Sequence, residues 1–386
     1  MSPTLTFFSP CPRGLEPLLA DEIREQGGQT VQPISGGVQW QGSLRACYQV
    51  NLSSRLASRV LLRIATSPYR DEASLYQAAH AIDWPQWFSV ERTLRVDVTA
   101  VRSPLNSVDF ALLRIKDAIC DRFRDACGER PSVDTRAPQV RISAFLDERE
   151  AVFYIDTSGE PLFKRGYRRA RREAPLKENL AAGLIRLTGW DPAVDGFIDP
   201  MCGSGTIAIE AALIATATAP GKQRQFAFEN LSLHDAPLWA EVRTYTIALE
   251  RPARQQPILA SDRDPAAIED VRAGLRYWGL EDRVQVEVRD VTAAAAPGAS
   301  GVWLTNPPYG VRMGSEPELI DLYRAIGTTL KRRFAGWRCH FITEDRTLPR
   351  GLGLRESRRT PIFNGRLDCR LFEFRMVEGS ARKRAD

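Results

Sequence analysis

The stretch Gly196-Phe-Ile-Asp-Pro-Met-Cys-Gly-Ser-Gly-Thr206 decides the fold class. Its short apolar start predicts a strand over Gly196–Asp199, and the apolar spacing after Gly205 predicts a helix over Thr206–Ala217. Gly203 and Gly205 allow a tight turn between the two, because no Cβ intrudes. A glycine turn that joins a strand to a helix is typical of open α/β sheets, which bind ligands at the carboxyl ends of their strands.

Further strands and helices alternate around this turn. The alternation predicts a parallel sheet covered on both faces. Asn364-Gly365 between two strand-like runs predicts a terminal hairpin, so the last strand, Leu371–Val377, should run antiparallel. Residues 220–256 fit no simple unit and are interpreted as an insertion or extended loop. The remaining strands are expected over Pro257–Ala260, Val284–Val288, Val302–Thr305 and His340–Thr343, and the helices over Ala174–Leu187, Pro265–Trp278 and Pro317–Phe334.

Two smaller α/β units are predicted before this sheet. Residues 4–65 have helical spacing over Gly14–Gln26 and Leu44–Arg59. Residues 66–157 have a helical pattern over Ala111–Cys127 and a hairpin pattern around residues 147–150. The densest positive segment, KRGYRRARR from Lys164 to Arg172, follows where a linker to the next domain should lie.

The bulk composition excludes several classes. A chain of 386 residues that is 43% hydrophobic and 26% charged fits two or three globular domains. Seven cysteines without a CxxC pair favour reduced thiols in the cytosol over a disulfide framework, and three distant histidines argue against a metal site. Neither a signal peptide nor a membrane-spanning stretch is evident, so we expect a cytoplasmic protein. The net charge of +5 is too mild to indicate a nucleic-acid partner by itself.

The glycine turn carries groups that suit an amino-acid ligand. Ser204 and Thr206 lie beside a helix N-terminus, which favours a ligand carboxylate, and Asp199 could attract an ammonium group. The amino-acid tail of S-adenosylmethionine (SAM) has both groups. Gly-x-Gly alone is more often a plain turn, but Asp262 ends the next strand, where a carboxylate could accept both ribose hydroxyls.

Two other acids after strands are less specific. Asp264 precedes a proline and a helix, so an N-cap role is the better interpretation. Asp290 ends the third strand, where it could accept from an adenine amino group or be an ordinary solvated acid, and the spacing favours neither.

The motif Asn306-Pro-Pro-Tyr-Gly310 directly after a predicted strand is the most informative signal. Pro307 and Pro308 stiffen the turn and remove two donors. The Asn306 carboxamide and a neighbouring carbonyl then give two acceptors that can hold both hydrogens of an exocyclic amine, while Tyr309 offers a face on which a base could stack. A rigid structural turn is the alternative. Because a base in a duplex cannot reach such a pocket, the target would be unpaired or flipped out.

The chain resembles bacterial THUMP-domain methyltransferases that modify N2 of guanosine in large-subunit ribosomal RNA. The resemblance runs from about Phe8 to Phe374, and the N-terminal and linker motifs are its most specific part. It rests on Gly36–Gly42, Ser54–Val60, Lys116–Ile119, Arg165–Arg168, Ala174–Ala182, Asp199–Thr206, Ile209–Ala212 and Asn306–Gly310.

The resemblance implies four regions. These are a ferredoxin-like subdomain over residues 1–65, a THUMP RNA-binding domain over 66–157, a basic linker over 158–173 and a class I (Rossmann-like) methyltransferase domain over 174–386. Some relatives carry a second methyltransferase at the C-terminus. This chain ends at Asp386 without one, so a second activity is not expected.

The resemblance also assigns site residues. Asn306, Pro307, Pro308 and Tyr309 would be catalytic, with Asp262 at the ribose and Asp290 at the adenine. Asn306 would also border the cofactor, and the rest of the cofactor site would be Pro175, Leu176, Lys177, Glu178, Asp199, Pro200, Met201, Cys202, Gly203, Ser204, Gly205 and Thr206.

The basic linker is interpreted as an RNA contact. Arginine runs are usually solvated faces, but this run joins an RNA-binding-like domain to a catalytic one, so phosphate contact is favoured. The residues concerned are Lys164, Arg165, Arg168, Arg169, Arg171 and Arg172.

Three functions remain open at this stage. The first is methylation of guanine N2 in 23S ribosomal RNA, with transfer RNA as a variant. The second is amino-methylation of DNA adenine or of protein glutamine, against which the N-terminal units and the linker argue. The third is a non-catalytic RNA-binding or ribosome-assembly protein, against which the intact motifs argue.

Overall fold

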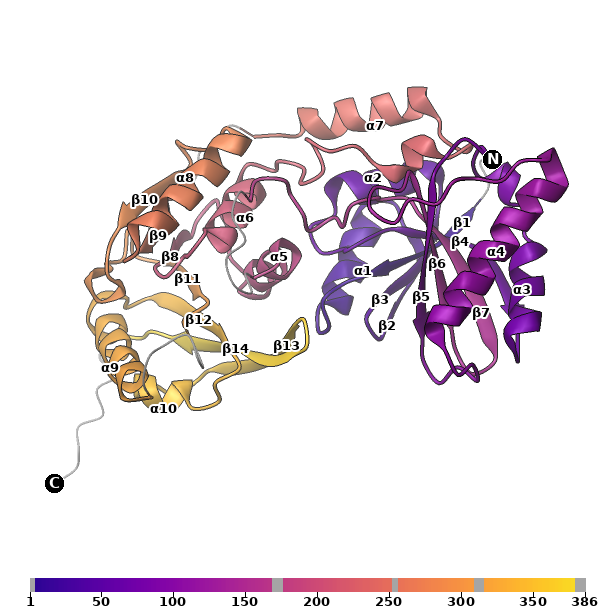
Figure 1. Ribbon diagram of the computed structural model, residues 1–386. Coiled ribbons are helices and arrows are strands. Elements are labelled where there is room, and N and C mark those ends of the chain that lie inside the picture. Colours follow the sequence, from indigo (N-terminus) through magenta and orange to yellow (C-terminus); the bar gives the residue numbers. More distant parts are fainter. Residues whose placement is uncertain (1–3, 169–175, 252–255, 309–315, 379–386) are drawn as a thin grey trace. The chain divides into compact units, whose positions relative to one another are not determined.

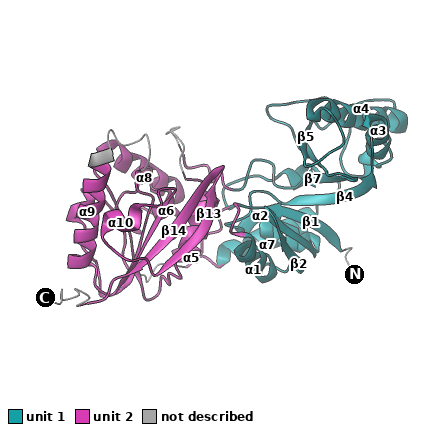
Figure 2. Ribbon diagram, turned by 90° about the horizontal axis from the view of Figure 1, so that it is seen from below, with its two compact units in different colours: residues 1–11, 16–162, 221–248 teal, residues 12–15, 163–220, 249–386 magenta. Residues whose placement is uncertain are grey.

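The computed structural model describes residues 4–168, 176–251, 256–308 and 316–378. The chain forms two compact units (Figure 2). Unit 1 comprises residues 1–11, 16–162 and 221–248, and unit 2 comprises residues 12–15, 163–220 and 249–386. Each unit is built on its own seven-stranded sheet.

Unit 1 joins the two predicted N-terminal units through one continuous sheet, in the order β2-β3-β1-β4-β7-β6-β5 (Figure 1). Its central strand β4 pairs antiparallel with both β1 and β7, so the two halves share a backbone hydrogen-bond ladder. The strands are β1 (Leu5–Pro10), β2 (Gln29–Ile34), β3 (Gly37–Gly42), β4 (Leu61–Pro68), β5 (Leu94–Ala100), β6 (Val140–Leu146) and β7 (Glu150–Asp156).

One face of this sheet carries the core of unit 1. Phe7, Leu62 and Ile155 lie in one register row across β1, β4 and β7, and all three are buried. Trp40 stacks on Phe7 with a ring separation of 4.3 Å on the same face. The helices of unit 1 are α1 (Glu16–Glu25), α2 (Leu44–Ser53), α3 (Glu72–His80), α4 (Val108–Cys127) and α7 (Ala236–Ala248), with 3-10 turns η1 (Trp84–Gln86) and η2 (Ala227–Asn230).

The structure corrects one prediction in this unit and adds detail to another. The helix expected over Leu44–Arg59 ends at Ser53, because Ser54 takes an extended conformation and its hydroxyl donates to the buried carboxylate of Glu22. The segment expected to be an insertion, residues 220–256, contains η2 and α7, and residues 221–248 belong to unit 1. Phe228 of this segment is fully buried, and its ring lies 4.4 Å from that of Tyr48 in α2.

Unit 2 has the sheet order β10-β9-β8-β11-β12-β14-β13. Strands β8 to β12 pair in parallel, and β14 is antiparallel to β12 and β13, which confirms the predicted parallel sheet and its antiparallel end. The strands are β8 (Gly196–Asp199), β9 (Ile258–Asp262), β10 (Val284–Val288), β11 (Gly301–Thr305), β12 (Trp337–Thr343), β13 (Arg358–Asn364) and β14 (Leu367–Arg375).

Helices lie on both faces of this sheet (Figure 1). Trp303, Phe341 and Phe334 belong to a buried cluster under α9 and α10, while α5, α6 and α8 pack together elsewhere in the unit. The helices are α5 (Glu178–Leu187), α6 (Thr206–Ala215), α8 (Pro265–Trp278), α9 (Glu316–Arg333) and α10 (Leu348–Leu352), with the 3-10 turn η3 (Val291–Ala293).

The first helix of unit 2 begins later than its sequence pattern predicts. The expected start at Ala174 and Pro175 lies outside the described residues, and α5 begins at Glu178 after Lys177 in an extended conformation. Across the described part of the chain, the helices are all too short or too polar to cross a membrane.

Candidate cofactor and catalytic site

The order of the strands in unit 2 places a ligand crevice between β8 and β11. These two strands are neighbours although β9 and β10 lie between them in sequence, so the sheet reverses its direction of growth here. Ligands of open α/β sheets bind outside the carboxyl ends of the strands at this reversal. Asp199 ends β8 and Asn306 follows β11, so both predicted motifs lie at this point.

The glycines of the turn after β8 have different roles. Gly205 caps α6 with φ +79°, and a Cβ there would come within 2.8 Å of the Val271 side chain in α8. Gly203 has φ +53°, but a Cβ there would meet nothing within 4 Å. Packing of α8 therefore requires a glycine at position 205. At position 203, the missing side chain leaves open space that a ligand could occupy.

Asp199 is a buried acceptor in need of a positive partner. Its carboxylate is 1% exposed and accepts a hydrogen bond of 3.0 Å from the Thr305 hydroxyl at the end of β11. Burial raises the pKa of Asp199 to about 8, and the nearby Asp262 charge adds to the rise. A ligand ammonium would stabilise the ionised form, which is the interaction predicted for SAM.

Asp262 holds the turn from the neighbouring strand. One carboxylate oxygen accepts from the Gly203 backbone N–H at 2.9 Å, and the other accepts from the Asp264 N–H at 3.0 Å. An ionised carboxylate has about four acceptor positions, so capacity for a ribose diol remains. Asp264 caps α8 by accepting from the Ala266 N–H at 2.9 Å, which confirms its N-cap prediction.

Asp290 has a structural use that the sequence did not reveal. It caps η3 and accepts from both the backbone N–H of Thr292, at 2.8 Å, and its hydroxyl, at 2.6 Å. The hydroxyl hydrogen bond, followed by the backbone one, lowers the pKa of Asp290. An adenine contact would have to use the remaining acceptor positions of this carboxylate.

Asn306 lies half-buried directly after β11, followed by the buried Pro307 and the half-buried Pro308. Within the described part of the chain, its carboxamide makes no hydrogen bond. Tyr309, predicted to stack on a base, lies outside the described residues. The amide at the crevice is therefore available to a ligand.

Arg168 connects the start of α5 to the glycine turn, and we call this set of contacts the Arg168 brace. Arg168 forms an ion pair of 2.7 Å with Glu178, which is buried, and donates to the Thr206 hydroxyl at 3.0 Å and to the Leu176 carbonyl. The predicted cofactor residues Leu176 and Glu178 are thereby tied to the first residue of α6. Because its guanidinium is used in this brace, we assign Arg168 a positioning role in place of the predicted phosphate contact.

The prediction that Arg165 contacts RNA was wrong. Its side chain is 1% exposed and pairs at 3.1 Å with Glu210, which is 0% exposed, inside α6. Arg165 is therefore part of the core of unit 2 rather than of a solvated strip. Arg169, Arg171 and Arg172 lie outside the described residues.

A pocket of about 410 Å³ lies beside the brace. It joins three segments far apart in sequence, namely residues 163–168, the start of α5 and the tip of the β13–β14 hairpin. The Lys177 ammonium lies 4.9 Å from the centre of the Phe163 ring in this pocket. Its lining is Phe163, Lys164, Arg168, Lys177, Glu178, Asn364 and Leu367.

The site residues fit SAM on three observations. Asp199 is a buried acceptor for an ammonium, the N-terminus of α6 suits a carboxylate, and there is open space within 4 Å of the position where Gly203 lacks a Cβ. Together with the sheet order and the Asn-Pro-Pro turn, these features define a Rossmann-like, SAM-dependent methyltransferase.

The chain belongs to the RMKL-like methyltransferase family, whose domain matches residues 165–373. A THUMP domain matches residues 69–156, and an RlmL ferredoxin-like domain matches residues 6–61. The resemblance drawn from the sequence motifs is confirmed, as are the fold class and the cofactor SAM.

Similar proteins agree with this membership. A ribosomal RNA large subunit methyltransferase K/L of Methylococcus capsulatus is 41% identical over 97% of the chain, which covers 52% of that relative. A candidate RNA methyltransferase of Synechocystis sp. is 37% identical, with 97% of each chain covered. The crystal structure of SMU.472, a candidate methyltransferase complexed with SAH, is 30% identical, covers 100% of both chains and has a TM-score of 0.89. The chain thus spans about half the length of the K/L relatives.

Proposed function

We propose that this protein transfers a methyl group to the exocyclic N2 amine of an unpaired guanosine in 23S ribosomal RNA, in the cytoplasm. The observation that carries the proposal is the half-buried carboxamide of Asn306, which hydrogen-bonds to none of the described residues and follows β11 where that strand pairs with β8. Thr305, the residue before it, is hydrogen-bonded to Asp199, so the proposed amine acceptor and the proposed ammonium acceptor are held by adjacent strands.

The residues of the chain would act mainly by positioning. SAM supplies an electrophilic methyl group when bound. The Asn306 carboxamide oxygen and a carbonyl of the proline turn would accept the two N–H hydrogens of the amine, which directs its lone pair out of conjugation with the base. Positioning of this kind is worth roughly 7–11 kcal/mol of a barrier in favourable cases. The methylated amine is acidic enough to release its proton to water, so no strong general base is needed.

RNA is the favoured substrate on three grounds. Relatives of this chain are named as large-subunit ribosomal RNA methyltransferases, and the THUMP match covers residues 69–156. The pocket beside the Arg168 brace is also lined by Lys164 and Lys177, whose positive charges suit a phosphate-bearing ligand. Guanine N2 is the amine that the family resemblance implies, and transfer RNA is the alternative substrate.

Labelled methyl transfer tests the proposal. The full chain is incubated with labelled SAM and with ribosomal RNA, transfer RNA, DNA or a protein pool, each from cells that lack the gene. Label in ribosomal RNA that is recovered as N2-methylguanosine after digestion is expected. Label confined to DNA or protein would refute the RNA assignment, label confined to transfer RNA would select the alternative, and N6-methyladenosine would refute the N2 assignment.

A further inference from the structure

The sheet of unit 1 has a face that its helices do not cover. Residues alternate between the two faces of a strand, so the neighbours of the buried row Phe7, Leu62 and Ile155 point the other way. Helices α1 to α4 pack on the face of the sheet that carries this buried row. On the opposite side, most residues of the described strands are half-buried or exposed, which is the pattern of a face open to solvent.

Aromatic side chains lie on this open face. Phe8 in β1 is half-buried, and its ring centre lies 6.3 Å from that of Tyr154 in β7. Phe145 in β6, also half-buried, lies in register with Val152 of β7. A half-exposed aromatic ring on a sheet is a surface on which an unpaired base can stack.

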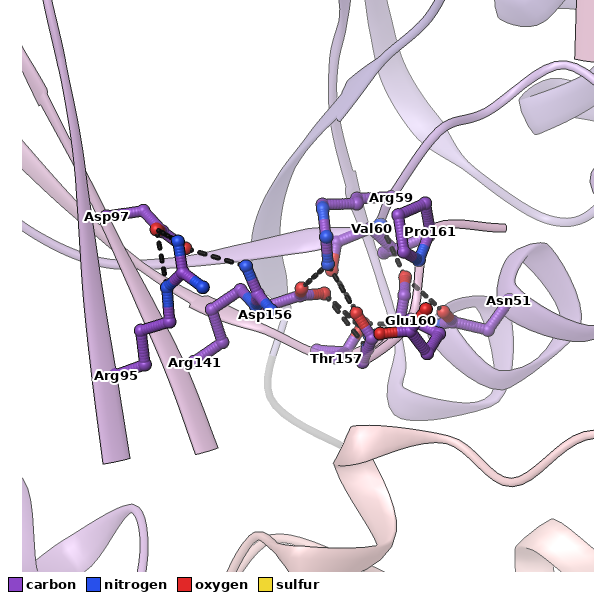
Figure 3. Close-up of polar contacts among 12 residues, drawn as sticks. Asn51, Arg59, Val60, Arg95, Asp97, Arg141, Asp156, Thr157, Glu160 and Pro161 are labelled. Carbon is purple, nitrogen blue, oxygen red and sulfur yellow. Dashed lines mark hydrogen bonds and ion pairs between the residues drawn. The ribbon is translucent and has the colours of Figure 1, made fainter. Parts of the chain in front are cut away.

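Arginines surround these rings. Arg63 in β4 lies in register with Tyr154 and is exposed, and the structure gives it no ion pair or hydrogen bond among the described residues. Arg95 and Arg141 are register neighbours on β5 and β6. Both guanidinium groups converge on the single carboxylate of Asp97 (Figure 3), at 2.8 Å from Arg95 and 2.8 Å from Arg141.

This part of the face is positively charged. Asp97 offsets one of the three arginines Arg63, Arg95 and Arg141. Asp156 on the same face is fully buried and paired with Arg59, as Figure 3 shows, so it adds no exposed negative charge. Glu150, at the far end of β7, is the other acid on the face. Two guanidinium groups fixed by one carboxylate retain N–H donors that suit phosphate oxygens.

We propose that the helix-free face of the unit 1 sheet is a platform for a single-stranded segment of the RNA substrate. Bases stack on Phe8 and Phe145, and phosphates bind Arg63, Arg95 and Arg141. The proposal rests on the RNA substrate inferred above, and it assigns a recognition surface outside the methyltransferase site. Duplex RNA hides its base faces, so the aromatic contribution should be specific to unpaired RNA.

Binding of a labelled single-stranded RNA and of the same sequence as a duplex, measured by fluorescence anisotropy, tests the platform. Arg63→Gln and Arg141→Gln should each weaken single-strand binding roughly five- to tenfold at about 0.1 M salt and lower the salt slope by about 1. Phe8→Ala should weaken single-strand binding at least about fivefold and change duplex binding little.

Arg124→Gln is the matched control. Arg124 lies in α4 and is held by Asp121 at 2.6 Å, much as Arg141 is held by Asp97, but it lies on the helical side of the sheet. This variant should bind RNA like the wild type. SAM affinity and thermal unfolding of every variant show whether the protein is folded, and Arg63→Gln is informative even if Phe8→Ala is unstable, because Arg63 is exposed.

The platform and the proposed function can fail separately. If the wild type methylates RNA but Arg63→Gln, Arg141→Gln and Phe8→Ala bind RNA unchanged, the platform is refuted and the function stands. If these variants lose activity on ribosomal particles while keeping naked-RNA binding, the face binds protein and the RNA platform is likewise refuted. If the wild type methylates no RNA, the proposed function itself fails.

Discussion

Two side chains at the ends of neighbouring strands, Asp199 and Asn306, differ in how the protein prepares them. Asp199 is buried and accepts a hydrogen bond from Thr305, whereas the half-buried Asn306 amide bonds to none of the residues that the structure describes. We propose that the first receives the ammonium group of SAM and the second the amine of the RNA base.

Asn306→Ala removes one of two acceptors proposed to orient the amine. We expect the rate of methyl transfer at saturating RNA to fall by about 100- to 1000-fold, comparable with removal of one preorganised hydrogen-bonding group from other active sites. SAM affinity should stay near that of the wild type, because the amide is not part of the proposed ammonium or ribose contacts. Calorimetric titration with SAM and single-turnover transfer measure the two effects, and wild-type transfer by the variant would contradict the mechanism.

Asp199 should release a proton when SAM binds at pH 7. Its pKa of about 8 in the free protein lies above pH 7, so the carboxyl group is mostly protonated there. A bound ammonium favours the carboxylate and lowers that pKa, so the proton leaves. Titrations in buffers with different ionisation enthalpies count the released protons. Asp199→Asn keeps an acceptor for Thr305 but should abolish the release, and the same proton count in this variant would argue against the contact.

In the basic run from Lys164 to Arg172, arginines that look equivalent in the sequence have different structural roles. Its arginines read alike in the sequence, yet Arg165 is buried against Glu210 and Arg168 braces the glycine turn through Glu178 and Thr206. Sequence spacing cannot separate such roles, because each depends on which acid the fold brings near. The acids were visible in the sequence, but the pairings join residues up to 45 positions apart.

Arg165→Ala should lower the unfolding free energy of unit 2 by about 3–5 kcal/mol, because it leaves the Glu210 carboxylate buried and uncompensated. The double variant Arg165→Ala with Glu210→Ala should lose less than the sum of the two single variants. Denaturant unfolding curves of the wild type, the two single variants and the double variant give these unfolding free energies. Strict additivity would mean that the two side chains are not coupled.

Residues 221–248 belong to unit 1 although residues of unit 2 flank them in sequence, and a mutation can test this assignment. Phe228→Ala empties a fully buried site next to Tyr48, so unit 1 should lose about 3–5 kcal/mol of stability. Phe228 lies inside the sequence range of the methyltransferase match, yet SAM affinity should be unaffected. Unfolding curves and SAM titration of the same variant separate these outcomes, and an effect on SAM binding alone would contradict the placement.

For the molecule as a whole, all described residues assigned to SAM belong to unit 2. SAM should therefore raise the melting temperature of the transition that belongs to unit 2 and leave that of unit 1 in place. At about 100 times its dissociation constant, SAM stabilises its unit by about 2.7 kcal/mol. Differential scanning calorimetry tests this, with Phe228→Ala identifying the unit 1 transition; equal shifts of both transitions would contradict it.

Much of the fold was predictable because its signals are local. The glycine turn, the alternating strands and Asn364-Gly365 each depend on a few consecutive residues, and the structure confirms the sheet that they predict. The union of β1 to β7 in one sheet and the packing of Phe228 on Tyr48 depend on contacts across long stretches of chain. At the site, Asp199 and Asn306 stood out by motif, whereas Thr305, an ordinary strand residue, gained its role only through the β8–β11 pairing.

The two units exchange pieces of chain, since residues 12–15 belong to unit 2 and residues 221–248 to unit 1. During synthesis, the N-terminal unit therefore cannot complete its fold when residue 162 leaves the ribosome, because α7 and Phe228 have yet to be translated. Neither unit can be grafted onto another protein by a single cut.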